Sequence, residues 1–120
     1  MDILRMFEKA DNAEAYRAGM VIFSAGDPAE LMYVVLDGEI ELRKDGRLLN
    51  TIGPGSLLGE LALIHKRPRS ATAVARTDCR LAPVNEKRFL FLVQQTPFFA
   101  LHVMRALGER IVQRDVEADR

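Results

Sequence analysis

Residues 31–52 read LMYVVLDGEIELRKDGRLLNTI, in which short apolar runs rich in β-branched side chains alternate with Asp-Gly pairs. Such runs are typical of β-strands. Asp37-Gly38 and Asp45-Gly46 have the composition of two-residue hairpin turns, so we expect each pair to join antiparallel neighbours. Between the two turns, Ile40 and Leu42 alternate with charged residues, which predicts a strand with one buried and one wet face.

The same rhythm of short strands and turns extends from Glu14 to Val84. No segment in this region is long enough to provide the helical crossovers that a parallel sheet requires. We therefore predict a mainly β unit over residues 14–84, an antiparallel roll or sandwich with flanking helices. Its clearest strands are Met20–Ser24, Leu31–Leu36, Glu39–Arg43 and Arg47–Ile52.

After Val84 the apolar residues adopt helical spacing, which predicts helices over residues 85–95 and 97–114; residues 1–12 are expected to be a helical segment as well. The last helix carries an apolar stripe that includes Leu107 and Ile111. This stripe either packs on the β unit or forms the seam of a homodimer, and the sequence leaves both interpretations open.

Composition limits the class of protein. With 120 residues and ordinary globular composition, we expect one domain over residues 1–120. The formal net charge is +0, which argues against nucleic-acid binding by this chain alone.

No apolar run approaches the roughly 20 residues of a membrane span. The single cysteine, Cys79, cannot form an internal disulfide, which is consistent with a cytoplasmic protein.

Residues 53–75, GPGSLLGELALIHKRPRSATAVA, carry the chemistry. A glycine-rich turn leads into a short predicted helix, followed by a basic loop and a strand. The first backbone N–H groups of a helix lack partners, so those of Leu61 and Ala62 could donate to an anion. Gly59 would allow close approach of a ligand, and Arg69 would supply charge-assisted hydrogen bonds to a phosphate.

Glu60 suggests a second component of this ligand. A carboxylate repels phosphate but accepts a hydrogen bond from a hydroxyl group, so the combination is suited to a ribose phosphate. The alternative is a surface turn in which Glu60 pairs with Arg67 or Arg69. On the residues alone, this alternative is favoured.

The run Gly59-Glu60-Leu61-Ala62-Leu63, followed by Arg69-Ser70-Ala71-Thr72, resembles the phosphate-binding cassette of cyclic nucleotide-binding domains. These are the domains of cAMP-dependent kinase regulatory subunits, catabolite activator proteins and cyclic-nucleotide-gated channels. The similarity covers about residues 15–112. It implies an eight-stranded antiparallel β-roll with a short cassette helix and two C-terminal helices, with a cyclic nucleotide bound inside the roll.

The resemblance also implies roles for individual residues. Glu60 would accept from the ribose 2′-hydroxyl group, and Arg69 would pair with the cyclic phosphate. Backbone contacts or close approach would come from Gly59, Leu61, Ala62 and Ala71.

Base recognition is less well defined by the resemblance. Ser70 stands where cGMP-preferring relatives commonly carry threonine, which favours cAMP over cGMP as the ligand. Leu107 and Ile111 are candidates for an apolar lid over the base. Leu58 and Lys66 depart from the common pattern of the family, in which phenylalanine and glycine are frequent at these positions.

These features predict a sensor that couples nucleotide occupancy to movement of the C-terminal helices and acts on an unidentified downstream protein. We expect no enzyme, cofactor or metal, because no nucleophile and base pair is recognisable and the sequence holds only His65 and His102. The alternatives are the ligand-sensing part of a transcription regulator and a scaffold that binds only protein. Because only a few residues follow Val112, we expect no DNA-binding domain in this chain, and Met1 favours a stand-alone protein.

Overall fold

The structure is a computed structural model that describes residues 3–118, apart from the side chains of Ala62 and of residues 110–118. The chain divides into two compact units. Asp2–Glu86 contains the strands and the first two helices, α1 (Ile3–Phe7) and α2 (Glu60–His65). Lys87–Arg120 contains most of α3 (Glu86–Gln95) and all of α4 (Pro97–Ala118).

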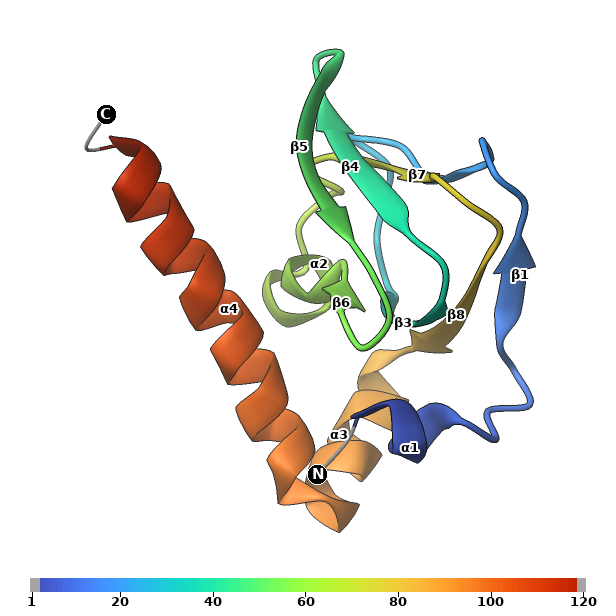
Figure 1. The fold of residues 1–120 in the computed structure, drawn as a ribbon. Coiled ribbons are helices and arrows are strands. Elements are labelled where there is room, and N and C mark those ends of the chain that lie inside the picture. Colours follow the sequence, from blue (N-terminus) through green and yellow to red (C-terminus); the bar gives the residue numbers. More distant parts are fainter. Residues whose placement is uncertain (1–2, 119–120) are drawn as a thin grey trace. The chain divides into compact units, whose positions relative to one another are not determined.

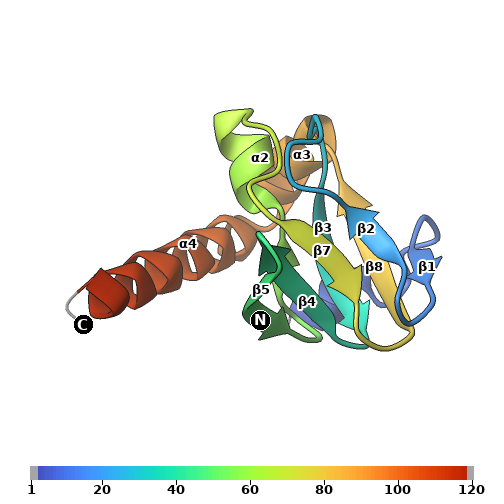
Figure 2. The ribbon, with the colours of Figure 1, turned by 90° about the horizontal axis from the view of Figure 1, so that it is seen from above.

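Eight antiparallel strands form two four-stranded sheets within the described residues (Figures 1 and 2). The first sheet has the order β1-β8-β3-β6 and the second has the order β2-β7-β4-β5. The predicted eight-stranded antiparallel architecture is therefore confirmed. The strands are β1 (Glu14–Tyr16), β2 (Val21–Phe23), β3 (Met32–Asp37), β4 (Ile40–Lys44), β5 (Arg47–Ile52), β6 (Leu57–Leu58), β7 (Thr72–Ala75) and β8 (Cys79–Val84).

The Asp45-Gly46 turn is a hairpin, as predicted. β4 and β5 pair antiparallel with Lys44 opposite Arg47, so the loop has two residues. Both loop residues have positive φ, 52° at Asp45 and 76° at Gly46. This combination is that of a type I′ turn, whose twist matches the twist of the flanking strands.

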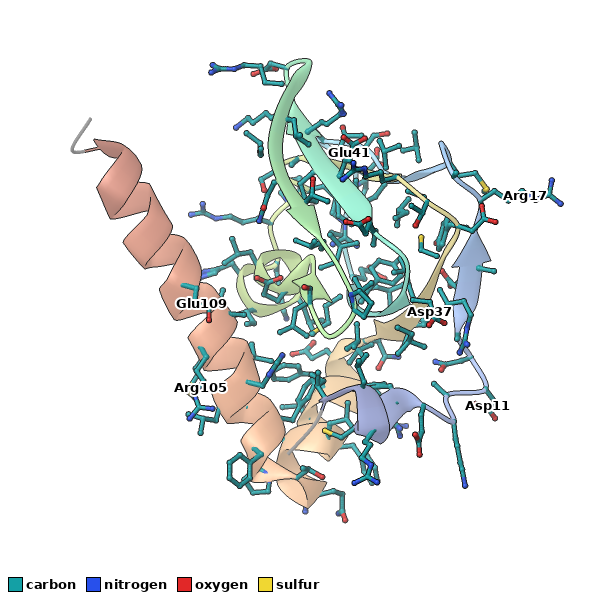
Figure 3. The ribbon with its side chains drawn as sticks, in the orientation of Figure 1. Asp11, Arg17, Asp37, Glu41, Arg105 and Glu109 are labelled. Atoms are coloured by element: carbon teal, nitrogen blue, oxygen red, sulfur yellow. The ribbon has the colours of Figure 1, made fainter. Side chains whose placement is uncertain are left out.

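The hairpin predicted at Asp37-Gly38 is wrong. β3 belongs to the first sheet and β4 to the second, so the turn is a corner between sheets. Gly38 has a φ of 86°, and a Cβ there would overlap the Asp78 carbonyl group and Cys79. At the same corner, Asp37, labelled in Figure 3, lies 3.2 Å from Nη1 of Arg80 on β8. The positive φ of Gly38 is compatible both with a corner between sheets and with a hairpin turn, so the Asp-Gly pair alone does not distinguish the two.

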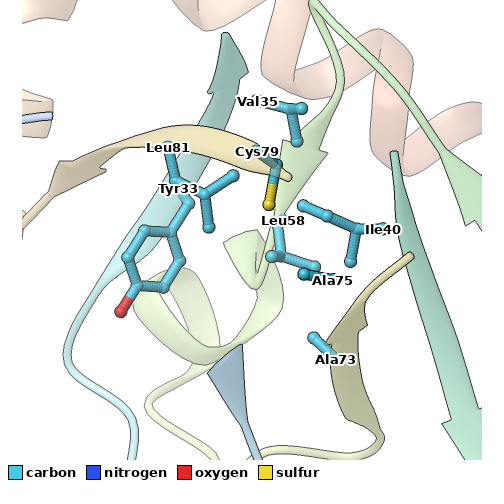
Figure 4. Packing of buried hydrophobic residues seen from close by; sticks show 8 residues of the cluster. All are labelled: Tyr33, Val35, Ile40, Leu58, Ala73, Ala75, Cys79 and Leu81. Carbon is cyan, nitrogen blue, oxygen red and sulfur yellow. The ribbon is translucent and has the colours of Figure 1, made fainter. Parts of the chain in front are cut away.

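The hydrophobic core lies between the two sheets and draws on both (Figure 4). In β3, all residues from Met32 to Leu36 are buried, which explains why this strand is a continuous apolar run rather than an alternating one. The central cluster consists of Tyr33, Val35, Leu58, Cys79 and Leu81 from the first sheet and Ile40, Ala73 and Ala75 from the second.

The C-terminal unit is a helical pair. α4 begins at Pro97, where the missing backbone N–H group of proline costs no helical hydrogen bond. The rings of Phe89 and Phe99 meet edge to face, with centroids 5.5 Å apart, and join α3 to α4. Among the described residues, we found no helix with the length and apolar character that crossing a membrane requires.

Candidate functional site

The short helix α2 follows directly on Gly59, which adopts the left-handed conformation with a φ of 77°. The next residue in that conformation, Lys66, with a φ of 55°, ends the helix. A Cβ at Gly59 would overlap Nη1 of Arg69, so a glycine at this position makes room for the guanidinium group. The turn before α2 and the loop after it are thereby brought together.

Glu60 and Arg69 are both buried, with 0% and 7% of their surfaces exposed. Acidic and basic side chains are almost never buried to this degree without a specific interaction. The interpretation of this segment as an ordinary surface turn is therefore wrong. In contrast, Lys66 and Arg67 in the intervening loop are exposed, as a solvated basic loop would be.

Three hydrogen bonds fix Arg69. Its backbone carbonyl group accepts from the Gly26 N–H group at 2.8 Å, and its own N–H group donates to the Asp27 carbonyl group at 2.9 Å. At the far end of the side chain, Nη2 donates to the carbonyl group of Leu31 at 2.8 Å. The loop between β2 and β3 thus holds both ends of this residue.

Aromatic rings cover the guanidinium group. Cζ of Arg69 lies 4.0 Å from the centroid of the Phe23 ring and 5.9 Å from that of Tyr33. Burial lowers the pKa of the Arg69 guanidinium, and this effect is opposed by Tyr33 and by the carboxylate of Asp27. An arginine nevertheless keeps its charge at neutral pH, so a cation is held inside the unit.

Two hydrogen-bond donors of the guanidinium group have no acceptor among the described residues. Nε and Nη1 of Arg69 are buried and make no hydrogen bond with any described residue. An unsatisfied buried donor costs free energy, and such groups in native structures call for an explanation such as a missing ligand. The arrangement is suited to receiving an anion.

Sequence reasoning identified Glu60 and Arg69 but missed the residues that support the guanidinium group. Phe23 and Tyr33 were recognisable as strand residues, and Asp27 as part of a turn. None carried a local signal that it would meet Arg69, because these contacts join segments distant in the chain. Leu31 contributes only its carbonyl group, which no side-chain pattern reveals.

The other predicted site residues are distributed as follows. Leu61 and Ala71 are partly buried, and Ser70 is exposed next to β7. The side chain of Ala62 lies outside the described residues. Leu107 is a partly buried residue of α4, in the C-terminal unit, and the side chain of its predicted companion Ile111 is outside the described residues.

Two known proteins that are similar to this chain are named for cyclic AMP. The chain is 33% identical over 109 residues to the cyclic AMP receptor protein of Thermus thermophilus, a match that covers 87% of this chain and 50% of the relative. It is 44% identical over 71 residues to the cAMP-dependent protein kinase regulatory subunit of Eremothecium gossypii, covering 59% of this chain and 16% of that protein. The chain thus spans half of the first relative and a smaller part of the second.

Structural comparison and a family model agree with these relatives. The crystal structure of Thermus thermophilus catabolite activator protein superimposes with a TM-score of 0.80 at 33% identity, covering 89% of this chain and 53% of that one. The model described as the cyclic nucleotide-binding domain matches residues 13–96. On this evidence of sequence and fold, the chain belongs to the cyclic nucleotide-binding domain family.

Proposed function

We propose that this protein is a sensor that binds a cyclic mononucleotide, with Arg69 pairing with the cyclic phosphate. One observation carries the proposal. Arg69 is 7% exposed, and Nε and Nη1 of its guanidinium group have no hydrogen-bond partner among the described residues. A phosphate would supply acceptors and opposite charge together, which compensates for the cost of burying the cation.

Glu60 is proposed to accept a hydrogen bond from the ribose 2′-hydroxyl group. It is the first residue of α2 and is fully buried, so the helix places its carboxylate inside the unit near the Gly59 turn that adjoins Arg69. Backbone contacts from Gly59, Leu61, Ala62 and Ala71 would complete the cassette.

We favour cAMP over cGMP as the ligand because Ser70 replaces the threonine common in cGMP-preferring relatives. The two curated relatives described above are named for cyclic AMP. A cGMP-dependent protein kinase of Drosophila melanogaster is 33% identical over 81 residues, so cGMP remains the comparison ligand in the tests below. No chemical step is assigned to the chain, which we propose is a non-enzymatic regulatory module without a cofactor.

We propose that nucleotide binding at the site is coupled to movement of the C-terminal unit. We treat residues 1–120 as one functional domain in which nucleotide occupancy moves α3 and α4, with Leu107 and Ile111 as candidates to cover the base. A ligand can shift such an equilibrium only by its unequal affinity for the two arrangements. The buried, unpaired thiol of Cys79 fits action in the reducing cytoplasm.

Calorimetric titration with cAMP, cGMP and linear 5′-AMP tests the site. Loss of the charged hydrogen bonds in Arg69→Ala should weaken cAMP binding by about tenfold to several-hundredfold. Arg67→Ala is the matched control, since it removes the same charge from an exposed position in the same loop. Equal affinities of wild type and Arg69→Ala would disprove the assigned role.

A second candidate is the ligand-sensing part of a transcription regulator of the catabolite activator type, lacking its DNA-binding domain, which is favoured by the match to 50% of the cyclic AMP receptor protein. Neither candidate predicts that residues 1–120 bind duplex DNA by themselves. Binding of mixed-sequence duplex DNA in fluorescence anisotropy that appears only with cAMP and falls steeply with added salt would therefore contradict both.

A further inference from the structure

One segment of the chain, residues 23–31, contacts both the backbone and the side chain of Arg69. Gly26 and Asp27 bond its backbone, and the carbonyl group of Leu31 accepts from Nη2 at 2.8 Å. Phe23 makes a different kind of contact, because its ring centroid lies 4.0 Å from Cζ and the ring therefore covers the flat guanidinium group. The hydrogen bonds fix the backbone of Arg69 and the Nη2 end of its side chain, whereas the ring fixes the plane of the guanidinium group.

The Phe23 ring is itself held by the core. It stacks on the Tyr33 ring, with centroids 6.5 Å apart and an interplanar angle of 23°. Tyr33 is 7% exposed and belongs to the central cluster between the sheets, against which Phe23 is packed. The guanidinium group therefore rests on a surface that the core of the domain keeps in place.

We propose that Phe23 is a positioning residue, whose ring holds the Arg69 guanidinium in its binding orientation before the ligand arrives. This inference rests on the proposed function, in which Arg69 pairs with the cyclic phosphate. The face of an aromatic ring carries negative charge and attracts a cation, most strongly where water is excluded. A guanidinium held in this way loses less conformational freedom on binding, which strengthens affinity.

The first test is calorimetric titration of purified variants with cAMP. Phe23→Leu keeps an apolar side chain but removes the ring, and it should weaken binding about three- to tenfold, as expected for one side chain that must be ordered on binding. Phe23→Tyr keeps the ring and should restore affinity to within about twofold of wild type.

Ile22→Ala is the matched control on the same strand. Ile22 is partly buried and packs against the same cluster as Phe23, so its truncation lowers the melting temperature through lost packing. It should leave cAMP affinity unchanged. A loss of affinity in Ile22→Ala as large as that in Phe23→Leu would mean that general loosening of β2 is the cause and would overturn the inference.

A double-mutant cycle separates positioning from packing. If the ring acts through the guanidinium group, Phe23→Leu should cause no further loss of cAMP affinity in the Arg69→Ala background. An equal loss in both backgrounds would overturn the inference while leaving the role of Arg69 intact.

Fluorinated phenylalanines at position 23 keep the shape of the ring and so avoid an unfolded variant. Each added fluorine withdraws charge from the ring face, so cAMP affinity should fall stepwise with fluorination, and only when Arg69 is present. A flat series alongside a weakened Arg69→Ala variant would overturn the positioning role alone. If wild type fails to bind cAMP or Arg69→Ala binds normally, the proposed function fails and the inference fails with it.

Discussion

Arg69 and Glu60 are the buried charged side chains among the described residues. Burying a charge is expensive unless the surroundings compensate for it. For Arg69, the compensation consists of one carbonyl group, two aromatic rings and the carboxylate of Asp27. The two remaining donors, Nε and Nη1, have no partner among the described residues and are the ones that we propose bind the ligand.

The proposed role of Glu60 predicts how binding depends on the sugar of the ligand. Glu60→Gln should weaken binding of cAMP about tenfold, because a charged acceptor is replaced by a neutral one. The same substitution should barely change binding of 2′-deoxy-cAMP, which offers no hydroxyl group to that acceptor. Calorimetry with both ligands provides the comparison, and equal losses would remove Glu60 from this role.

The buried thiol of Cys79 should make the free energy of unfolding depend on pH in the alkaline range. Burial raises the pKa of its thiol above the ordinary value of 9.0. As the pH rises above that value, the unfolded chain releases a thiol proton that the folded chain retains, so the free energy of unfolding falls. Urea denaturation at about pH 8 and about pH 10 should show a smaller decrease for Cys79→Ala than for wild type. Equal decreases would show that the thiol does not contribute.

At the scale of elements, turns decide how the strands are joined. The Asp45-Gly46 and Asp37-Gly38 turns have the same two residue types, and the glycines have φ values of 76° and 86°. One joins neighbours within a sheet, whereas the other leads from one sheet to the other. The difference lies in the surroundings: Gly46 faces open space, but Gly38 lies against Asp78 and Cys79.

A series of glycine substitutions should reflect this difference. Gly46→Ala introduces strain from positive φ and should lower the free energy of unfolding by about 1 kcal/mol. Gly38→Ala adds an overlap with neighbouring backbone, so it should cost about 3 kcal/mol. Gly53→Ala has neither problem and should change stability by less than about 0.5 kcal/mol.

Urea denaturation of the three variants measures the order directly. If Gly38→Ala proved as mild as Gly46→Ala, the corner would have to relax without cost, contrary to the close backbone approach seen there.

At the scale of the whole molecule, the proposed sensor must link two compact units, Asp2–Glu86 and Lys87–Arg120. The candidate site lies in the first unit, and the helices proposed to respond lie mainly in the second. Nucleotide binding can be transmitted only if it favours one arrangement of these units over another.

Distance measurement between spin labels tests this coupling. Leu49 on β5 and Met104 on α4 are exposed, so cysteines at these positions in a Cys79→Ala background can carry the labels. Saturating cAMP should change the distance distribution, and Arg69→Ala should prevent the change at the same cAMP concentration. An unchanged distribution in a chain shown by calorimetry to be saturated would contradict the coupling.

From the amino-acid order alone came the mainly β antiparallel unit with flanking helices and the Asp45-Gly46 hairpin, whereas the cassette with Glu60 and Arg69 came from the resemblance to cyclic nucleotide-binding domains. The β unit and the hairpin depend on local backbone preferences and on periodicity, which are contained in short stretches of chain. Only the tertiary structure decided that Asp37-Gly38 leads between sheets and that Arg69 is buried over Phe23 beside the Leu31 carbonyl group. Burial depends on which distant segments pack together, and the energy of a charge is set by those neighbours rather than by the residues adjacent to it in sequence.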